Sequence, residues 1–194
     1  MRTALRALLA TLVLAAITGI AYPLVVTGIG QVAFAHDANG SLVGVNGQSV
    51  GSDLIGQQWT GPQWFYGRPS AVQDDAATSS GTNLGPQSQQ LADDIEARSA
   101  AILKVESPYA PGLTTADIPV DLLTTSGSGL DPDISVAAAR FQAPRIASVR
   151  GLPLDQVMAL IDAHTAQKTL GFLGEARVNV LELNIALQEV APRA

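Results

Sequence analysis

A run of 24 residues without a charged side chain, from Ala7 to Gly30, dominates the amino-terminal part of the chain. A helix rises about 1.5 Å per residue, so this run reaches about 36 Å and can cross the ~30 Å hydrocarbon core of a bilayer with some tilt. Arg2 and Arg6 precede the run, and basic residues are retained on the cytoplasmic side. The sequence therefore predicts a single-pass protein of the cell membrane with a cytoplasmic N-terminus (1–6), a transmembrane helix (7–34) and an extracytoplasmic body (35–194).

A cleaved signal peptide is the alternative interpretation, because Ala33-Phe34-Ala35 has the small-x-small form of a cleavage site. The apolar core of a signal peptide is about 7–15 residues long, however, and this run is longer. Small residues on one side of a helix let another helix approach closely in lipid. Ala15, Gly19, Tyr22 and Pro23 are therefore candidate packing positions, which favours a retained anchor.

The charge of the chain lies mostly in the predicted body. Past Gly30 it has nine Lys and Arg against 17 Asp and Glu, a formal charge near −8. This balance argues against nucleic acid or anionic lipid as partners of the body. The chain has no cysteine, which excludes disulfides, thiol nucleophiles and thiolate metal sites.

Apolar periodicity and turn residues predict an α+β body with four helices and a small sheet. The expected helices lie between Pro86 and Pro108, from a cap at Asp133 or Ser135 through Phe141, after Pro153, and after a cap at Asn179, the last with Val180, Leu183, Leu187 and Val190 facing the core. Pro144 is expected to break or restart the second helix, and 118–125 to be extended. The aromatic-rich segment 57–68 is expected as a strand or tight loop against the core.

Catalytic and metal-binding patterns are weak in this sequence. Ser128 between two glycines, with Asp162 and His164, contains the residue types of a hydrolase triad, but it lacks the Gly-x-Ser-x-Gly elbow. Asp131 and Asp133 could offer oxygen ligands to a cation, although a turn and a helix cap explain them more simply. No phosphate-binding Gly-rich string with Lys and Ser or Thr occurs. We therefore expect no catalytic residue and no metal site.

Seven short groups of residues, spread along almost the whole chain, point to a family instead of to a catalytic site. They are Tyr22-Pro23-Leu24; 51–57; Gly67-Arg68-Pro69-Ser70; Asn83-Leu84-Gly85-Pro86; 126–132 with Ile134-Ser135; Pro144-Arg145; and Gly174-Glu175 with 178–184. In this order they resemble the KdpC family, a subunit of the bacterial Kdp (KdpFABC) potassium-transporting P-type ATPase. The resemblance makes these residues candidate partner contacts: Arg68, Pro69, Ser70, Asn83, Leu84, Gly85, Ser128, Asp131, Pro132, Arg145, Asn179 and Asn184.

The resemblance implies a non-catalytic accessory subunit of a high-affinity potassium uptake complex. Its implied partners are a channel-like subunit that selects potassium, a P-type ATPase subunit and a small membrane peptide. It also implies a role as a catalytic chaperone that raises the ATP affinity of the ATPase subunit, with ATP as the associated nucleotide. Because ATP is cytoplasmic and the body is predicted outside, we expect that effect to be indirect.

Two further hypotheses remain open at this point. The acidic body could lie over the outer mouth of the potassium-selecting subunit and favour cations there, within the ~8 Å Debye length of physiological salt. Alternatively, the chain could be a membrane-anchored extracytoplasmic enzyme or binding protein of the cell envelope.

Overall fold

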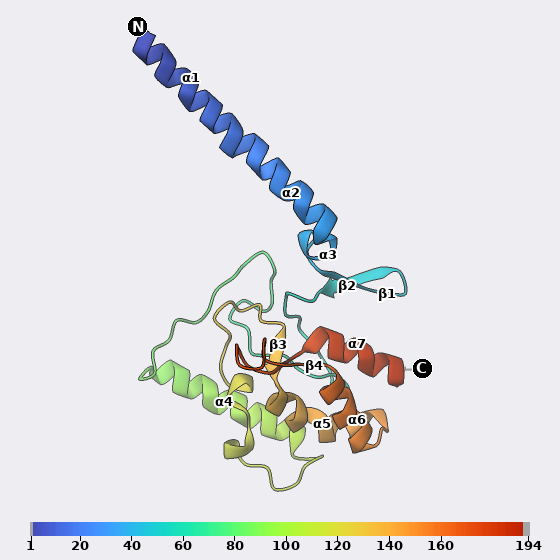
Figure 1. Cartoon of the computed structure of the whole chain (residues 1–194). Coiled ribbons are helices and arrows are strands. Elements are labelled where there is room, and N and C mark those ends of the chain that lie inside the picture. The colour runs from blue at the N-terminus through green and yellow to red at the C-terminus, as the bar shows by residue number, and fades with distance from the viewer. Residues whose placement is uncertain (1, 192–194) are drawn as a thin grey trace. The chain divides into compact units, whose positions relative to one another are not determined.

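The first unit of the chain is built on one long apolar helix (Figure 1). The computed structural model describes residues 2–191 and divides the chain between Ser52 and Asp53 into two compact units, which we describe separately. The long helix comprises α1 (Arg2–Ala16), the π-helical segment η1 (Ile17–Ala21) and α2 (Tyr22–Ala33). These 32 residues are long and apolar enough to cross a membrane, as predicted, and no side chain of them is buried.

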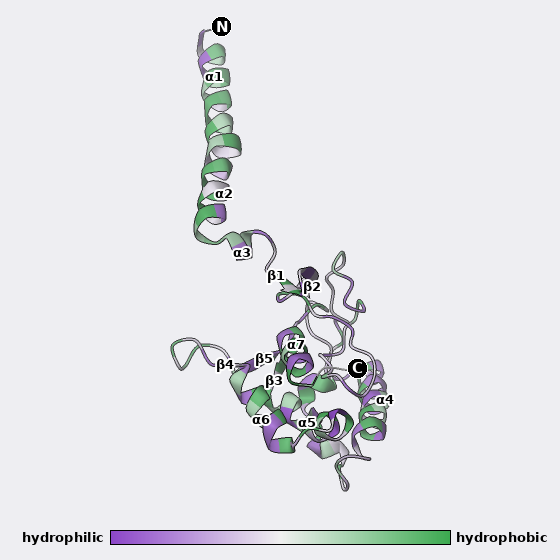
Figure 2. Cartoon of the chain, turned by 90° about the vertical axis from the view of Figure 1, so that its right-hand side faces the viewer, coloured by the Kyte–Doolittle hydropathy of each residue, from purple (hydrophilic) through white to green (hydrophobic). Residues whose placement is uncertain are grey.

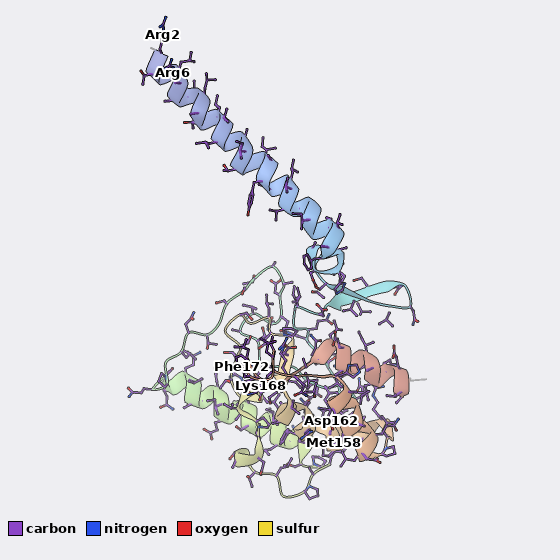
Figure 3. The ribbon with its side chains drawn as sticks, viewed as in Figure 1. Arg2, Arg6, Met158, Asp162, Lys168 and Phe172 are labelled. Atoms are coloured by element: carbon purple, nitrogen blue, oxygen red, sulfur yellow. The ribbon has the colours of Figure 1, made fainter. Side chains whose placement is uncertain are left out.

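The helix is hydrophobic along most of its length, and Arg2 and Arg6 lie at its amino end (Figures 2 and 3). It ends before Phe34, whose backbone leaves the helical region with φ −138° and ψ 45°. A short helix and an antiparallel hairpin follow: α3 (Ala35–Ala38), β1 (Leu42–Val45) and β2 (Gln48–Ser52). Asn46 and Gly47 form the hairpin turn with φ values of 52° and 78°, the conformation that Asn-Gly favours in two-residue turns.

The second unit is an α+β body, as predicted. Four α-helices and a small antiparallel sheet with the strand order β3-β5-β4 are described in it. The helices are α4 (Gln89–Glu106), α5 (Val136–Arg150), α6 (Leu154–Ala163) and α7 (Val180–Val190); the strands are β3 (Asp133–Ser135), β4 (Thr165–Ala166) and β5 (Arg177–Asn179); two 3-10 turns are η2 (Thr115–Asp117) and η3 (Val120–Leu122).

The core of the body forms around α5. Small alanines on this helix allow close approach of α6, and Phe65 and side chains of α7 belong to the same buried cluster. The fully buried members of this core are Phe65, Ala138, Ala139, Ala143, Ile146, Val157, Ile161, Val178, Leu183 and Leu187. Trp59 packs against this cluster from segment 57–68, which is a loop, and its ring centroid lies 5.1 Å from that of Trp64.

Side-chain caps begin three of these helices. Ser88, Ser135 and Asn179 each accept a hydrogen bond from the backbone N–H three residues on, which satisfies a donor that the first helical turn leaves free. The predicted cap at Asn179 is confirmed, and Ser135 rather than Asp133 caps α5. The predicted start near Pro86 is wrong, because the Ser88 cap delays α4 to Gln89.

Three other predictions are wrong. Pro144 lies inside α5 without breaking it, because burial of the surrounding helix offsets the ~3 kcal/mol cost of a proline in a helix interior. Segment 118–125 contains the 3-10 turn η3 instead of a strand, since Pro119 at its N-cap removes a ladder donor. Val190 is 45% exposed as the last residue of α7, whereas Val180, Leu183 and Leu187 are buried as expected.

Candidate functional site

The apolar helix Arg2–Ala33 contains a π-turn next to the Tyr22-Pro23 pair. The Tyr22 N–H donates to the Ile17 carbonyl, five residues back, instead of to Thr18. Pro23 has no N–H, so it donates to neither Thr18 nor Gly19. The Thr18 hydroxyl donates to the Leu14 carbonyl. The turn therefore leaves a backbone carbonyl without its usual donor on an exposed helix.

In the body, the motif residues meet at a junction of loops. The Arg68 Nη1 lies 2.9 Å from the Asp131 Oδ2, and both side chains are about three-quarters buried. The Ser70 hydroxyl donates to the Gly129 carbonyl over 2.6 Å and accepts from the N–H groups of Val72 and Asp74. These contacts hold the loop that contains Arg68 and Ser70 against the loop that contains Gly129 and Asp131, although Arg68 and Asp131 are 63 positions apart in sequence.

Close backbone approach explains the glycines of this junction. Gly129 has φ +70°, and a Cβ there would lie 2.6 Å from the Ser80 carbonyl oxygen. Gly56 donates to the Leu130 carbonyl, and a Cβ on it would lie 2.7 Å from the Asp131 carbonyl oxygen. The Asn179 amide also donates to the Asp53 carbonyl over 2.7 Å. The motif residues at these positions therefore fix the fold of the loops.

Arg145 is the centre of a second, fully buried cluster. Its guanidinium is 0% exposed and pairs with Glu106 at 2.8 Å. It also donates to the carbonyls of Pro62 and Trp64, and to Gln142 Oε1. Burial raises the pKa of the Glu106 carboxyl above its ordinary value, although the Arg145 charge opposes that shift. The pair connects α4 and α5 to the aromatic loop.

Two buried amide side chains hold the same loop by reciprocal hydrogen bonds. Asn184 accepts from the Phe65 N–H over 2.9 Å and donates to the Phe65 carbonyl over 3.0 Å. Gln142 does the same with Tyr66, at 2.8 and 3.1 Å. Each amide thus satisfies both backbone groups of one loop residue, as a neighbouring strand would. The cluster is a structural tie between the loop and two helices.

A cavity of about 240 Å³ opens beside this cluster, between α4 and residues 66–69. Its lining is mainly apolar and includes Tyr66, Pro69, Ile102 and Leu122. Sites for drug-sized ligands typically enclose about 300–1,000 Å³ and carry convergent polar groups. The charged groups that line it have other partners: Glu106 pairs with Arg145, Arg68 with Asp131, and Arg98 with Asp94 and the Leu123 carbonyl, so its geometry does not indicate a particular ligand.

The candidate catalytic and metal residues are engaged in ordinary structural contacts. Asp162 pairs with Arg140 at 2.8 Å, and the Ser128 hydroxyl accepts from the Leu130 N–H. Asp131 Oδ1 accepts from the Asp133 N–H, the turn expected for Asp before proline. Among residues 2–191, no group of three or more His, Asp or Glu side chains could hold a metal ion.

The other candidate residues of the body lie in loops. Asn83 has φ 54° in the exposed segment before α4, with Leu84 half-buried and Gly85 accepting from the Ser88 N–H. The Pro69 and Pro132 carbonyls accept from the N–H groups of Ser126 and Val180. In the first unit, Ala15, Gly19, Tyr22 and Pro23 lie on the exposed apolar helix.

The family is shown by comparison with known proteins. The family model for KdpC, "K+-transporting ATPase, c chain", matches residues 4–189. The chain belongs to the KdpC family. It is 50% identical to the potassium-transporting ATPase KdpC subunit of Herminiimonas arsenicoxydans over 97% of this chain and 99% of that protein, and 51% identical to that of Herpetosiphon aurantiacus over 98% of each. The KdpC subunit of Caulobacter vibrioides is 52% identical over 90% of this chain and 86% of its own length.

Membership of the KdpC family gives the chain an accessory role in potassium uptake. It is a subunit of the K+-transporting ATPase and is not catalytic by itself, and its partners are other Kdp subunits. The sequence resemblance is therefore confirmed, as is the association of the chain with a membrane transport complex.

Sequence reasoning missed Glu106 and Gln142, the main partners of Arg145. Glu106 follows the apolar stripe of α4 as its last residue, and Gln142 lies between Phe141 and Ala143 on a helix with little amphipathic contrast. The one sequence signal was the place of Glu106 next to Val105, at the end of an apolar stripe. A carboxylate in such a place could have been predicted to lie buried beside an arginine.

An exposed apolar loop between β4 and β5 was also missed. Leu170, Phe172 and Leu173 are 79%, 72% and 50% exposed, and the loop extends from the rest of the body (Figure 2). A Lys168–Glu175 ion pair of 2.9 Å closes its base. The core of the body does not use these apolar side chains.

Proposed function

We propose that this chain is the assembly subunit of its transport complex. Its membrane helix packs on transmembrane helices of the channel-like potassium-selecting subunit and of the P-type ATPase subunit, beside the small membrane peptide. Its body lies on the extracytoplasmic side and holds the outer surfaces of these subunits together.

The exposure of the whole helix Arg2–Ala33 carries this proposal. No side chain of the helix is buried within the chain. Lipid can cover a uniformly apolar helix, but close packing in membranes relies on small residues and interhelical hydrogen bonds. Ala15, Gly19, Tyr22 and Pro23 supply such a face, so the helix is suited to pack on other subunits.

An exchange of the helix tests the assembly role. Residues 7–34 are replaced by an unrelated single-pass anchor, and the amount of channel-like and ATPase subunit that co-purifies in detergent is measured. We expect the body to be exported and the recovered complex to fall about tenfold or more. Recovery of an equally active complex would reduce the helix to a tether and remove the proposal.

Thiol labelling can test on which side of the membrane the body lies. The chain has no cysteine, so an introduced cysteine is the only position on it that a maleimide can label. Single variants Thr3→Cys and Ala71→Cys place a thiol at the amino end of the helix, ahead of the uncharged run, and on an exposed position of the body. In intact cells, a membrane-impermeant maleimide should label the Ala71 variant and spare the Thr3 variant until the membrane is permeabilised. The reverse pattern would contradict an extracytoplasmic body.

Any effect on ATP affinity is proposed to be indirect. ATP is cytoplasmic, and only residues 1–6 of this chain are expected on that side. The measurement is photolabelling of the assembled complex with an ATP analogue, with subunits separated afterwards. The ATPase subunit should be labelled and this chain should not; labelling of this chain that excess ATP abolishes would show direct contact.

The acidic body is also proposed to favour cations near the potassium entrance. Asp93, Glu96, Glu175 and Glu182 are exposed, and fields of such charges reach about 8 Å in physiological salt. The double variants Asp93→Asn with Glu96→Gln, and Glu175→Gln with Glu182→Gln, are compared for apparent potassium affinity at low salt. If neither pair changes that affinity, the electrostatic part fails while the assembly role is unaffected.

A further inference from the structure

We infer that the π-turn of the membrane helix is an acceptor site for a hydrogen-bond donor side chain on a transmembrane helix of a partner subunit. The inference rests on the proposed function, because it requires the helix to lie in a bilayer beside partner helices. It adds which atom of this chain is recognised and by what chemistry.

The acceptor is the backbone carbonyl of Thr18. In an α-helix its donor would be the N–H four residues on, at Tyr22, but that N–H is on the Ile17 carbonyl. In a continued π-turn the donor would be the N–H five residues on, at Pro23, which has none. The Thr18 hydroxyl cannot serve either, since it donates to Leu14. The carbonyl is therefore left without a donor from its own helix.

The position of the Thr18 carbonyl deep in the bilayer makes the missing hydrogen bond costly. Thr18 lies about 17 Å along the helix from Ala7, near the middle of a hydrocarbon core about 30 Å thick. Water is absent there, and an unsatisfied backbone group in lipid costs several kcal/mol. Freed carbonyls at proline in membrane helices are satisfied by neighbouring helices, hydroxyl side chains or ordered water.

The surroundings of the carbonyl leave room for a partner. Apart from Thr18, Ile20 and the backbone of its own helix, nothing lies within 4 Å of the position that a Cβ on Gly19 would occupy. Tyr22 is 66% exposed, so its side chain is not folded over the turn in the chain alone. The occupant is accordingly a polar donor, such as an Asn, Gln, Ser, Thr, Tyr or Trp side chain, on a helix that approaches at Gly19.

Mapping comes first in the test. A single Gly19→Cys thiol, in a chain that otherwise lacks cysteine, is crosslinked in the full complex to single cysteines placed along the partner helices. We expect one partner helix to react, with a donor residue within one turn of the crosslinked position. Ala21→Cys, two residues on and therefore on the opposite side of the helix, is the control and should not react with that helix. Equal crosslinking of both positions would overturn the inference.

The decisive variant is Pro23→Ala, which restores an N–H to the turn and should satisfy a carbonyl within the helix. The partner's donor then loses its acceptor, and association in detergent should weaken about 3- to 20-fold, the range that interhelical hydrogen bonds support. Ile20→Ala truncates an apolar side chain in the same turn and should change association less than twofold. If the two variants behave alike, the inference fails.

A double-variant cycle separates the hydrogen bond from general packing. Removing the mapped donor with an apolar residue of similar shape should weaken the wild-type complex but restore part of the loss in Pro23→Ala. Strictly additive effects would mean that the carbonyl is served by water or lipid, which also overturns the inference. If the exchanged helix 7–34 assembles normally, the proposed function fails as well; if only Pro23→Ala is silent, the proposed function survives.

Discussion

The helix Arg2–Ala33 and the body 53–191 use their polar groups differently. In the body, Arg145 is 0% exposed and its donors meet Glu106, Gln142 and two backbone carbonyls. In the helix, Pro23 and the π-turn leave the Thr18 carbonyl without a backbone donor. Buried polar groups that are satisfied within a chain stabilise its own fold, whereas groups left open in lipid favour association. Under the proposed function, the two regions have two tasks: the body satisfies its own polar groups, and the helix is completed by other subunits.

The largest expected effect is on the buried ion pair, which tests the self-sufficiency of the body. Arg145→Ala leaves Glu106 as an uncompensated buried charge, and we expect a loss of about 3–5 kcal/mol in unfolding free energy. Denaturant unfolding of the full chain in detergent, followed by Trp59 and Trp64 fluorescence, reports on the body because both tryptophans lie there.

Arg140→Ala is the matched control for this measurement. Its ion pair with Asp162 has side chains that are 50% and 58% exposed, and such pairs contribute about 0–1 kcal/mol. Equal losses for the two arginine variants would mean that the body does not depend on its buried polar cluster.

The next largest loss of stability is expected at the junction of loops around Gly129, where close approach of backbone atoms, and not an ion pair, limits which residue fits. Gly129→Ala puts a methyl group 2.6 Å from the Ser80 carbonyl oxygen at a left-handed φ of +70°. Strain and crowding should cost about 2–3 kcal/mol in the same unfolding assay. Gly127→Ala, where nothing lies within 4 Å of the added Cβ, should cost much less. A benign Gly129 variant would show that this junction is looser than its contacts indicate.

A smaller effect is expected for the Arg68–Asp131 pair. A double-variant cycle of Arg68→Ala and Asp131→Ala should give a coupling of about 1 kcal/mol, because both side chains are only partly screened by solvent. The same cycle on Arg140 and Asp162 should give about 0.3 kcal/mol. If the coupling at the junction is no larger than that of the exposed pair, charge does not contribute to holding these loops.

The smallest effect should appear at η2, on the exposed surface. Hydrogen bonds from the Thr114 hydroxyl and N–H lower the pKa of Asp117 below its ordinary value of 3.8. A lowered folded pKa means that this stabilisation is complete above about 3.8 and is lost as pH falls through the folded pKa. Asp117→Asn should thus be slightly less stable than wild type at pH 7, and the gap should close in acid. A constant gap in denaturation midpoint from pH 7 to pH 2 would contradict this.

Local pattern predicted the features that depend on neighbours in sequence. The uncharged run predicted the long apolar helix Arg2–Ala33, because the length of the run and its lack of charge do not depend on distant residues. Asn179 predicted its own cap, since a cap needs only the N–H three residues on. Asn46-Gly47 is a hairpin signal of the same kind that the sequence prediction did not use.

Predictions failed where a distant contact outweighed a local preference. Pro144 disfavours a helix locally, yet α5 continues because Ala143, Ile146 and Ala147 are buried in the core around it. Segment 118–125 has strand-like composition but curls into η3, where Asp121 accepts from the Ser135 N–H and hydroxyl. In both cases tertiary contacts outweigh propensities of a few tenths to a few kcal/mol.

The sequence by itself determined that the chain has one apolar helix long enough to cross a membrane, that its body is α+β, and that its motifs follow the KdpC order. Only the tertiary structure decided what the motif residues do: Arg145 meets Glu106 across 39 positions, and Asn184 meets Phe65 across 119. The reason is physical, since a lone arginine or asparagine has the same local preferences whether it faces solvent or lies in a core. Its burial depends on chain topology, which brings distant donors and acceptors together.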